Sequence, residues 1–372
     1  KPENYGKKFY GPSTLRTGLE KSRNLMTVRI ALDVGINKIM SITKKLNIYE
    51  NPEELFSISL GTAETTLLKL TSAYSTFVNG GKKIIPIMID RIQDRRGITI
   101  YNSDKRKCIT CEQISYLSDQ VPKIEDNFEQ IISPETAYQM ISMLEGVVQR
   151  GTGRKLKHLN LNLAGKTGTT NNNTDTWFIG FTSKLVVGVY VGFDEPASLG
   201  RYETGAKTAM PIFKKFILNS ISKQDATPFK VPDGIVMMVV DPITGQKVDF
   251  NSKNSIYESF KEKKMSEAIN FMSKKKLGSL IVLNKKKFVS GFVSDGDIRR
   301  QSRKNVIHLK VKDFMTKNPI YIDKEALAVK ALEIMNKKKI TSLIVAVTKA
   351  GKKQIKAIGI IHIHKIISAG IK

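Results

Sequence analysis

Cysteine and acidic residues are scarce in this sequence of 372 residues. It contains 2 cysteines, and 34 acidic residues stand against 61 basic ones, which gives a formal net charge of +27. The cysteines, Cys108 and Cys111, form a single C-x-x-C, which supplies too few ligands for a zinc site that normally needs four. The pattern favours a local disulfide over a metal, and two unrelated thiols are the alternative.

Long hydrophobic runs are absent as well. The longest nearly apolar stretch, residues 185–193, is too short to cross a bilayer, which needs ~20 residues. We therefore expect no membrane-spanning segment in these residues. The sequence begins at Lys1 without an initiator Met or a leader. We expect that it was cut from a longer protein, whose missing N-terminal part holds any membrane anchor.

The positive charge is unevenly distributed. Residues 261–372 carry 27 basic and 8 acidic side chains, whereas residues 1–260 carry 34 and 26. Such a surplus favours anionic partners, but lysine runs such as 274–276 are typical of solvated surfaces. No aromatic residues are interleaved with these runs to stack on bases, so we expect no nucleic-acid partner.

Residues 1–225 alternate between helical and strand patterns. Helical spacing of apolar residues occurs in 10–46, 61–77, 134–148 and 209–220. Strand patterns occur in 84–100, where residues 94–97 indicate a turn between two strands, and in 163–170, 176–182 and 186–193. This order predicts an α+β domain with a mainly antiparallel sheet. We expect residues 226–264 to be a C-terminal extension and linker, with a short strand at 235–240 and a boundary in the polar, lysine-rich stretch 251–264, which has no apolar period.

An internal repeat of about 60 residues follows Met265. The first repeat, 265–303, has the pattern helix, strand, strand, helix, and the second repeat, 308–371, returns to it. Each repeat is too small to bury its apolar faces alone. The two repeats are therefore expected to pack together as a second domain.

Two short motifs carry candidate chemistry. Lys166-Thr167-Gly168 offers a cation, a hydroxyl and close backbone approach, which suit an extended peptide that ends in a carboxylate. In the S-x-N triplet, Ser22 can relay a proton to a leaving amine and Asn24 can orient the substrate's peptide group. Taken singly, the first motif is equally consistent with a strand end and the second with a helix N-cap.

The order and surroundings of the motifs add a family resemblance. The set S-x-x-K, S-x-N and K-T-G is the signature of penicillin-interacting serine enzymes. Residues 1–260 resemble the transpeptidase domain of bifunctional class A penicillin-binding proteins. The resemblance lies in these segments: Pro2-Glu3-Asn4-Tyr5, Thr14-Leu15-Arg16, Ser22-Arg23-Asn24, Leu60-Gly61-Thr62, Ala73-Tyr74, Asn79-Gly80-Gly81, 165–170, 175–180 and Val191-Gly192.

The resemblance implies the penicillin-binding, β-lactamase-like fold and a serine-type D,D-transpeptidase that cross-links peptidoglycan. Its partners would be stem peptides and their β-lactam mimics at the periplasmic face of the inner membrane, with no cofactor or metal. The implied residues are catalytic Ser22, Asn24 and Lys166, and substrate-binding Thr167, Gly168 and Thr169.

The acylating serine of the family precedes the Pro-x-Asn-Tyr segment, so we expect this serine and its lysine to lie outside the chain. Two other matches to S-x-x-K, at residues 41–44 and 273–276, are rejected. The first follows Ser22 and lies in an amphipathic helical pattern, and the second lies in the other domain. We therefore expect an incomplete transpeptidase site, inactive by itself.

The repeat after Met265 resembles the pair of cystathionine β-synthase-type (CBS) motifs at the tail of arabinose 5-phosphate isomerases. The matching segments are 291–300, 311–319 and 359–364. In such modules a Ser or Thr and an Asp three residues later hold a ribose, so Ser294 and Asp297 are candidate contacts for an adenine nucleotide or a sugar phosphate. This implies an alternative function, a ligand-sensing regulatory module, and the other alternative is a purely packed pair.

The two resemblances imply different compartments, since the isomerase tail would be cytoplasmic. Charge and pattern both change near residues 261–265. We hypothesise that the chain is a chimera of two truncated proteins, joined there by gene rearrangement or by sequence assembly. Sequencing the source DNA across this junction tests the hypothesis, and one uninterrupted reading frame would contradict the assembly version.

We predict that the 372-residue chain forms no covalent adduct with benzylpenicillin. The motif groups that it contains orient and polarise a substrate but do not form the acyl bond. Intact-protein mass spectrometry after incubation with excess antibiotic checks this prediction. A stoichiometric gain of the antibiotic's mass would contradict it.

Overall fold

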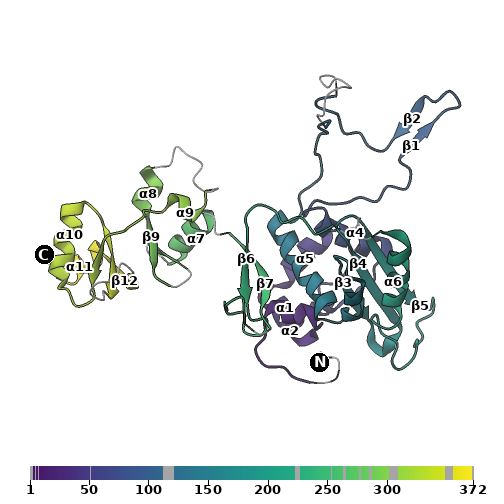
Figure 1. Ribbon diagram of the computed structural model, residues 1–372, viewed down its shortest axis with the longest axis horizontal. Helices are drawn as coiled ribbons and strands as arrows, with labels where there is room; N and C mark the ends of the chain where they lie inside the picture. The colour runs from purple at the N-terminus through teal and green to yellow at the C-terminus, as the bar shows by residue number, and fades with distance from the viewer. Residues whose placement is uncertain are drawn as a thin grey trace. The chain divides into compact units, whose positions relative to one another are not determined.

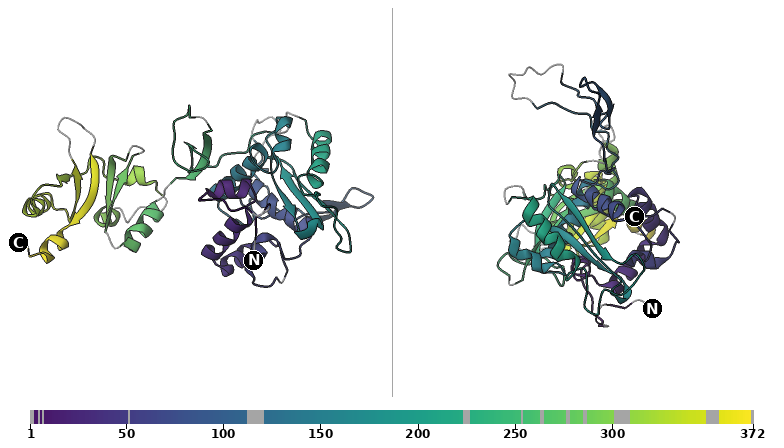
Figure 2. Two further views of the ribbon diagram at one scale, coloured as in Figure 1. Left: turned by 90° about the horizontal axis from the view of Figure 1, so that it is seen from below. Right: turned by 90° about the vertical axis from the view of Figure 1, so that its right-hand side faces the viewer.

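The structure is a computed structural model. It describes residues 3–370 except 5, 7, 51, 112–120, 223–226, 253, 263–264, 276–277, 285–286, 301–308 and 348–354. The chain divides into two compact units, Lys1–Lys261 and Glu262–Lys372, shown as ribbons in Figures 1 and 2. Among the helices so described, none has the length and apolarity that a bilayer crossing requires.

The first unit packs helices against a three-stranded antiparallel sheet of order β3-β4-β5. Its helices are α1 (Leu15–Glu20), α2 (Asn24–Val34), α3 (Ile36–Lys45), α4 (Leu67–Val78), α5 (Pro134–Gln149) and α6 (Ala209–Ser220), with the 3-10 turns η1 (Phe56–Leu60), η2 (Arg154–Leu159) and η3 (Asn171–Asn173). Its strands are β1 (Arg91–Gln93), β2 (Thr99–Asn102), β3 (Ala164–Thr169), β4 (Asp175–Phe181), β5 (Val186–Gly192), β6 (Ile235–Val240) and β7 (Ile256–Lys261).

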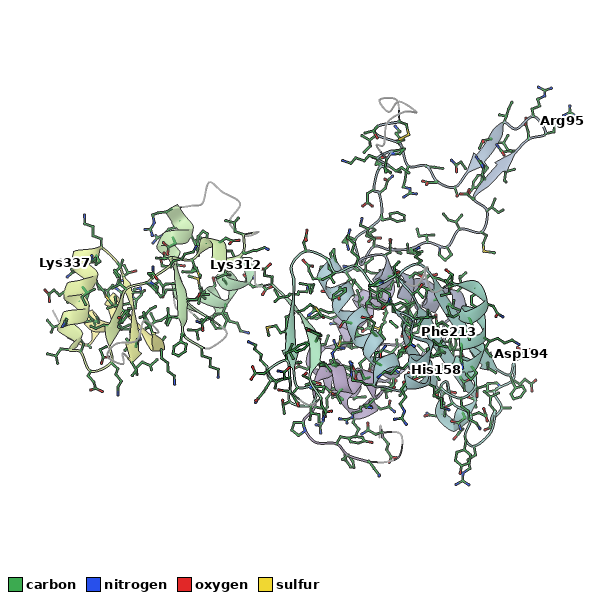
Figure 3. All side chains as sticks on the ribbon, in the orientation of Figure 1. Arg95, His158, Asp194, Phe213, Lys312 and Lys337 are labelled. Carbon is green, nitrogen blue, oxygen red and sulfur yellow. A yellow bond between two sulfur atoms is a disulfide. The ribbon has the colours of Figure 1, made fainter. Side chains whose placement is uncertain are left out.

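The sheet has an apolar cluster on each face. Phe178 and Phe181 on β4 are three residues apart and therefore point to opposite faces. Phe178 packs on Phe213 of α6 with ring centroids 4.9 Å apart, and Figure 3 shows Phe213 inside the first unit. Phe181 packs in a second cluster with residues of α5. The two clusters place β3, at the edge of the sheet, against α5.

A buried arginine connects three elements of the first unit. The side chain of Arg16 in α1 is only 3% exposed, and its Nε and one terminal nitrogen each donate to a carboxylate oxygen of Glu258 on β7 at 2.5 Å. Its terminal nitrogens also donate to the carbonyl and hydroxyl oxygens of Ser142 on α5, both at 2.8 Å. A terminal nitrogen of Arg16 lies 3.5 Å from the Oε1 of Glu20, and a terminal nitrogen of Arg150 lies 2.6 Å from the same oxygen. These pairs compensate the buried charges.

The segment 226–264 contains a hairpin as well as the expected strand at 235–240. β6 and β7 pair antiparallel over their full lengths. The polar stretch expected to mark the boundary therefore contains a strand at residues 256–261. β7 buries Ser259 and exposes Tyr257 and Phe260, so its buried positions carry no hydrophobic period.

The strand, turn and strand expected over 84–100 are present as the antiparallel hairpin of β1 and β2. The first strand is shorter than expected, because β1 begins at Arg91 and residues 84–90 are in no strand. Pro86 has no backbone N–H to donate, and Met88 nearby is 90% exposed. Asp94 accepts hydrogen bonds from the N–H groups of residues 96 and 98, which forms the tight turn at Arg95 that Figure 3 shows at the hairpin tip.

The second unit contains two small repeats. Its helices are α7 (Met265–Lys275), α8 (Asp295–Arg300), α9 (Val311–Phe314), α10 (Ala328–Lys338) and α11 (Ile363–Ser368). Its strands are β8 (Ser279–Leu283), β9 (Val289–Ser294), β10 (Tyr321–Asp323), β11 (Ser342–Val347) and β12 (Lys356–His362). β8 pairs antiparallel with β9 and β11 with β12, while β10 and β11 form a parallel pair joined through α10. A hydrogen bond of 2.9 Å from the N–H of Val289 to the carbonyl of Ile355 joins the repeats.

We predict that Arg16→Met lowers the free energy of unfolding of the first unit by about 3–5 kcal/mol, because it leaves the Glu258 carboxylate partly buried without its cation. Urea unfolding followed by fluorescence of Trp177, the chain's single tryptophan, measures this unit. The exposed Arg154 gives the matched control Arg154→Met, which is expected to change stability by less than about 0.5 kcal/mol. Equal stabilities of the two variants would contradict the role of Arg16.

Candidate active site

Ser22 lies in the turn between α1 and α2. Its φ angle of 51° is in the left-handed region that non-glycine residues seldom adopt. Two backbone hydrogen bonds hold the turn, from the N–H of Ser22 to the carbonyl of Leu19 and from the N–H of Arg23 to the carbonyl of Gly18. Such strain is characteristic of functional positions. The turn fixes the place of the Ser22 hydroxyl.

Lys166 comes from β3, 144 residues further along the chain. Its Nζ donates to the Oγ of Ser22 at 2.8 Å and to the carbonyl of Thr167 at 2.8 Å. The fold thus brings together one residue from each of the two sequence motifs. This contact could not be derived from their spacing.

The electrostatics of this pair suit proton transfer. Burial of the ammonium lowers the pKa of Lys166 to about 8. Near that pH about half of the amine is neutral, so it can accept a proton from the Ser22 hydroxyl to which it is hydrogen-bonded. The hydrogen bond and the lowered pKa are what a Ser–Lys proton-transfer pair requires.

The three residues predicted to bind substrate follow Lys166 on β3. The hydroxyl of Thr167 is 2.9 Å from that of Thr152. The Oγ1 of Thr169 accepts from the backbone N–H of Gly205 at 3.0 Å, which leaves its own proton available for donation. Thr169 is exposed at the sheet edge. Its hydroxyl can therefore reach a ligand that lies along β3.

Gly205 is a site residue that the sequence analysis missed. A Cβ atom there would lie 2.5 Å from the carbonyl oxygen of Gly168 and 2.4 Å from that of Trp177. Only glycine allows this approach, which places its N–H on Thr169. A glycine shortly before a predicted helix is the only sequence signal, and it is a weak one.

Asn24 is the first residue of α2. Its Nδ2 donates to the carbonyl of Glu3 at 2.9 Å, while the N–H of Leu25 donates to the Oδ1 of Asn4 at 3.2 Å. The S-x-N triplet thus ties the N-terminal segment to α2. No hydrogen bond joins Asn24 to Ser22 or Lys166 in the part of the chain that is described.

The rejected S-x-x-K matches lie away from this pair in the chain. Ser41 and Lys44 are exposed on α3, as expected for the solvent side of an amphipathic helix. Lys276 of the second match, and Pro2 and Tyr5 of the family segment, lie outside the described residues.

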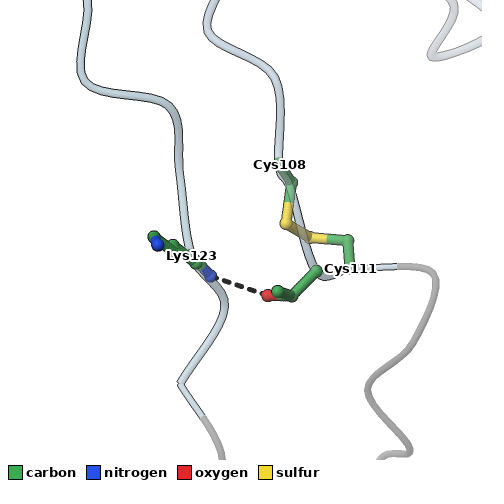
Figure 4. The surroundings of a disulfide bond; sticks show 4 residues. Cys108, Cys111 and Lys123 are labelled. Atoms are coloured by element: carbon green, nitrogen blue, oxygen red, sulfur yellow. Dashed lines mark hydrogen bonds between the residues drawn. A yellow bond between two sulfur atoms is a disulfide. The ribbon is translucent and has the colours of Figure 1, made fainter.

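The predicted local disulfide is confirmed. Cys108 and Cys111 are bonded, and the N–H of Lys123 donates to the hydroxyl of Thr110 between them at 2.9 Å (Figure 4). Across the residues described, no group of three or more His, Cys, Asp and Glu side chains is arranged to hold a metal ion.

In the second unit, Ser294 and Asp297 bind each other. The hydroxyl of Ser294 donates to Asp297 at 2.6 Å, and the N–H of Asp297 lies 3.3 Å from that hydroxyl oxygen, an arrangement that caps the start of α8. Arg300 donates to the other carboxylate oxygen at 2.5 Å. The structure thus gives both residues a structural role at the position predicted to hold a ligand.

His362 occupies in the second repeat the place that Ser294 has in the first. It is the last residue of β12 and the N-cap of α11. Its ring stacks on that of His364 with centroids 5.0 Å apart. Burial, and then the neighbouring His364, lower the pKa of His362, whereas Asp295 of the first repeat acts in the opposite direction.

Comparisons with known proteins agree with this geometry. The family model described as penicillin binding protein transpeptidase domain matches residues 2–218. The chain belongs to this transpeptidase family. A CBS domain model matches residues 260–304 and 311–372, so the predicted order of a transpeptidase part and a CBS pair is confirmed.

Relatives of the first unit are called penicillin-binding protein 1A. The one from Rickettsia bellii is 46% identical over 263 residues, which cover 70% of this chain and 33% of that protein. The one from Pseudomonas aeruginosa is 35% identical over 302 residues, which cover 73% of this chain and 37% of that protein. The crystal structure of penicillin-binding protein 1A from Haemophilus influenzae is 31% identical, has a TM-score of 0.58, and covers 69% of this chain and 41% of its own. The chain thus spans about a third of the length of these curated relatives.

We predict that Lys166 titrates near pH 8, well below ordinary lysines, because its ammonium is desolvated. NMR titration of the lysine Cε signals, with Lys166→Met to identify the resonance, measures this. Between pH 8 and 10.5 the unfolded chain binds the extra proton, so the free energy of unfolding rises with pH in that window and Lys166→Met removes this rise. The exposed Lys157 gives the control Lys157→Met, in which the free energy of unfolding should still rise with pH over this window. A Lys166 midpoint above pH 10 would contradict the prediction.

Proposed function

We propose that residues 1–261 supply the proton-transfer and substrate-orienting groups of a D,D-transpeptidase site that cross-links peptidoglycan. The observation that carries this proposal is the 2.8 Å contact between the Lys166 Nζ and the Ser22 Oγ, together with the lowered pKa of the lysine. A serine and a lysine whose pKa lies near 8 can pass a proton to a leaving amine and take one from an attacking amine.

The substrate would be a stem peptide that ends in D-Ala-D-Ala. Because β3 is an edge strand of the described sheet, an extended peptide can pair with it through the backbone. The hydroxyls of Thr167 and Thr169 and the cation of Lys166 lie on this strand and suit the terminal carboxylate. A β-lactam, which also carries a carboxylate, would occupy the same place.

The reaction would be acyl transfer. A serine attacks the carbonyl of the penultimate D-Ala and expels the terminal D-Ala as an amine, which takes its proton through Ser22 and Lys166; an acceptor amine then attacks the ester and releases the serine. We assign the acylating serine to none of residues 1–372. Ser22 is engaged with Lys166, and Ser41 is exposed on α3.

The proposed location is the periplasmic face of the inner membrane. The disulfide between Cys108 and Cys111 supports an oxidising compartment. The relatives named penicillin-binding protein 1A suggest the same class of cell-wall enzyme.

For the second unit, binding of an adenine nucleotide or a sugar phosphate at Ser294 and Asp297 stays a prediction. The Oδ2 of Asp297 accepts from both the N–H and the hydroxyl of Ser294, whereas its Oδ1 accepts from Arg300 alone and keeps a second lone pair for a ribose hydroxyl.

We predict that the chain binds diacetyl-L-Lys-D-Ala-D-Ala without reacting with it, and that the C-terminal amide of this peptide binds at least about ten-fold more weakly. Thr169→Val is expected to weaken binding of the acid about ten-fold, because one hydrogen bond to a charged group is lost. Isothermal titration calorimetry measures both.

The matched control is Thr99→Val, an exposed strand threonine on β2, which should bind the peptide as the unaltered chain does. The proposal fails if the peptide does not bind, or if the acid and the amide bind equally well.

A further inference from the structure

We infer that a second ligand site lies beside the Ser22 turn, and that it takes a carboxylate joined to an aliphatic group. A pocket of about 560 Å³ opens between the N-terminal segment and α2. Its walls are mostly apolar, with two arginines and one aspartate among them. The lining residues are Asn4, Phe9, Tyr10, Gly11, Pro12, Ser13, Arg23, Leu25, Met26, Arg29, Ile30 and Asp33.

Arg23 is the polar centre of this pocket. One terminal nitrogen donates to the hydroxyl of Ser13 at 2.5 Å, and the guanidinium lies 4.0 Å from the ring centroid of Tyr10. Its Nε is buried, yet within the described part of the chain it has no hydrogen-bond partner. Because this Nε is covered by other atoms of the chain, a ligand in the pocket would bind at the terminal nitrogens of Arg23.

A carboxylate is the acceptor that fits best. It can bind the two terminal guanidinium nitrogens side by side in the plane of the group, which leaves the flat face stacked on Tyr10. Asp33 is the acidic group in the lining. It lies ten residues along α2 from Arg23, roughly 15 Å at the helical rise, and does not neutralise that end of the pocket.

The rest of the ligand would be aliphatic. Phe9 is 81% exposed and Ile30 38% exposed, and both line the pocket together with Leu25 and Met26. A hydrocarbon group of several carbons would remove these side chains from water at about 25 cal/mol per Å². The pocket thus has a positive charge at one end and apolar walls beyond it, which suit a ligand with a carboxylate and a hydrocarbon tail.

This site is distinct from the transpeptidase site. The side chain of Ser22 is directed to Lys166 on β3, whereas the side chain of the next residue, Arg23, is directed to Tyr10 and Ser13 in the N-terminal segment. The inference therefore does not depend on the proposed transpeptidase function.

Titration of the full chain with octanoate, followed by NMR, tests the inference. We expect saturable binding, with acetate and 1-octanol each at least ten-fold weaker because one lacks the tail and the other the charge. N-acetyl-L-leucine distinguishes a peptide C-terminus from an acyl chain as the source of the acid, and tighter binding of either compound supports the site.

Arg23→Gln is expected to weaken octanoate binding at least ten-fold. Arg201, which lies 5.4 Å from the ring centroid of Tyr202 outside the pocket, gives the matched control Arg201→Gln, which should change nothing. Phe9→Ala, at an exposed position where folding is not at risk, should weaken octanoate several-fold and leave acetate unchanged. The inference is overturned if neither acid binds, or if Arg23→Gln and Arg201→Gln bind octanoate alike.

Discussion

The buried ion pair of Arg16 and Glu258 is the interaction on which the arrangement of the first unit depends. It fixes α1 against α5 and β7, and the last residue of α1, Glu20, extends the network. The carbonyl of Glu20 accepts from the N–H of Thr152, whose hydroxyl is hydrogen-bonded to Thr167 on β3. A continuous set of polar contacts therefore leads from the buried charge to the strand that carries Lys166.

The same network explains a restriction on α5. A Cβ atom at Gly146 would lie 1.9 Å from the Oε1 of Glu20, so a side chain there would displace the carboxylate from Arg150. Glycine in the middle of a helix lowers its stability, and here it makes room for a buried acid. Ser22 stands two residues after Glu20, so its position is set by this packing as well as by its own turn.

The sequence predicted the elements whose buried residues are apolar. β3, β4 and β5 were expected from their alternation, and α5 from Ser133 and Pro134 at its start, where the Ser133 hydroxyl does accept from the N–H of Thr136. β7 was missed because its buried residue is a serine and the half-buried residue before it is the charged partner of Arg16. Motif order indicated that Ser22 and Lys166 belong together, but their contact and the close approach of Gly205 arise only from the fold.

The open edge of β3 has a cost for the free protein. An unpaired strand can recruit the edge of another molecule in the same way as it can recruit a peptide, and such edges are common starting points of aggregation. Here the strand is only six residues long, which is one way in which natural sheets discourage pairing between copies. The shortness that suits a peptide ligand therefore also limits self-association.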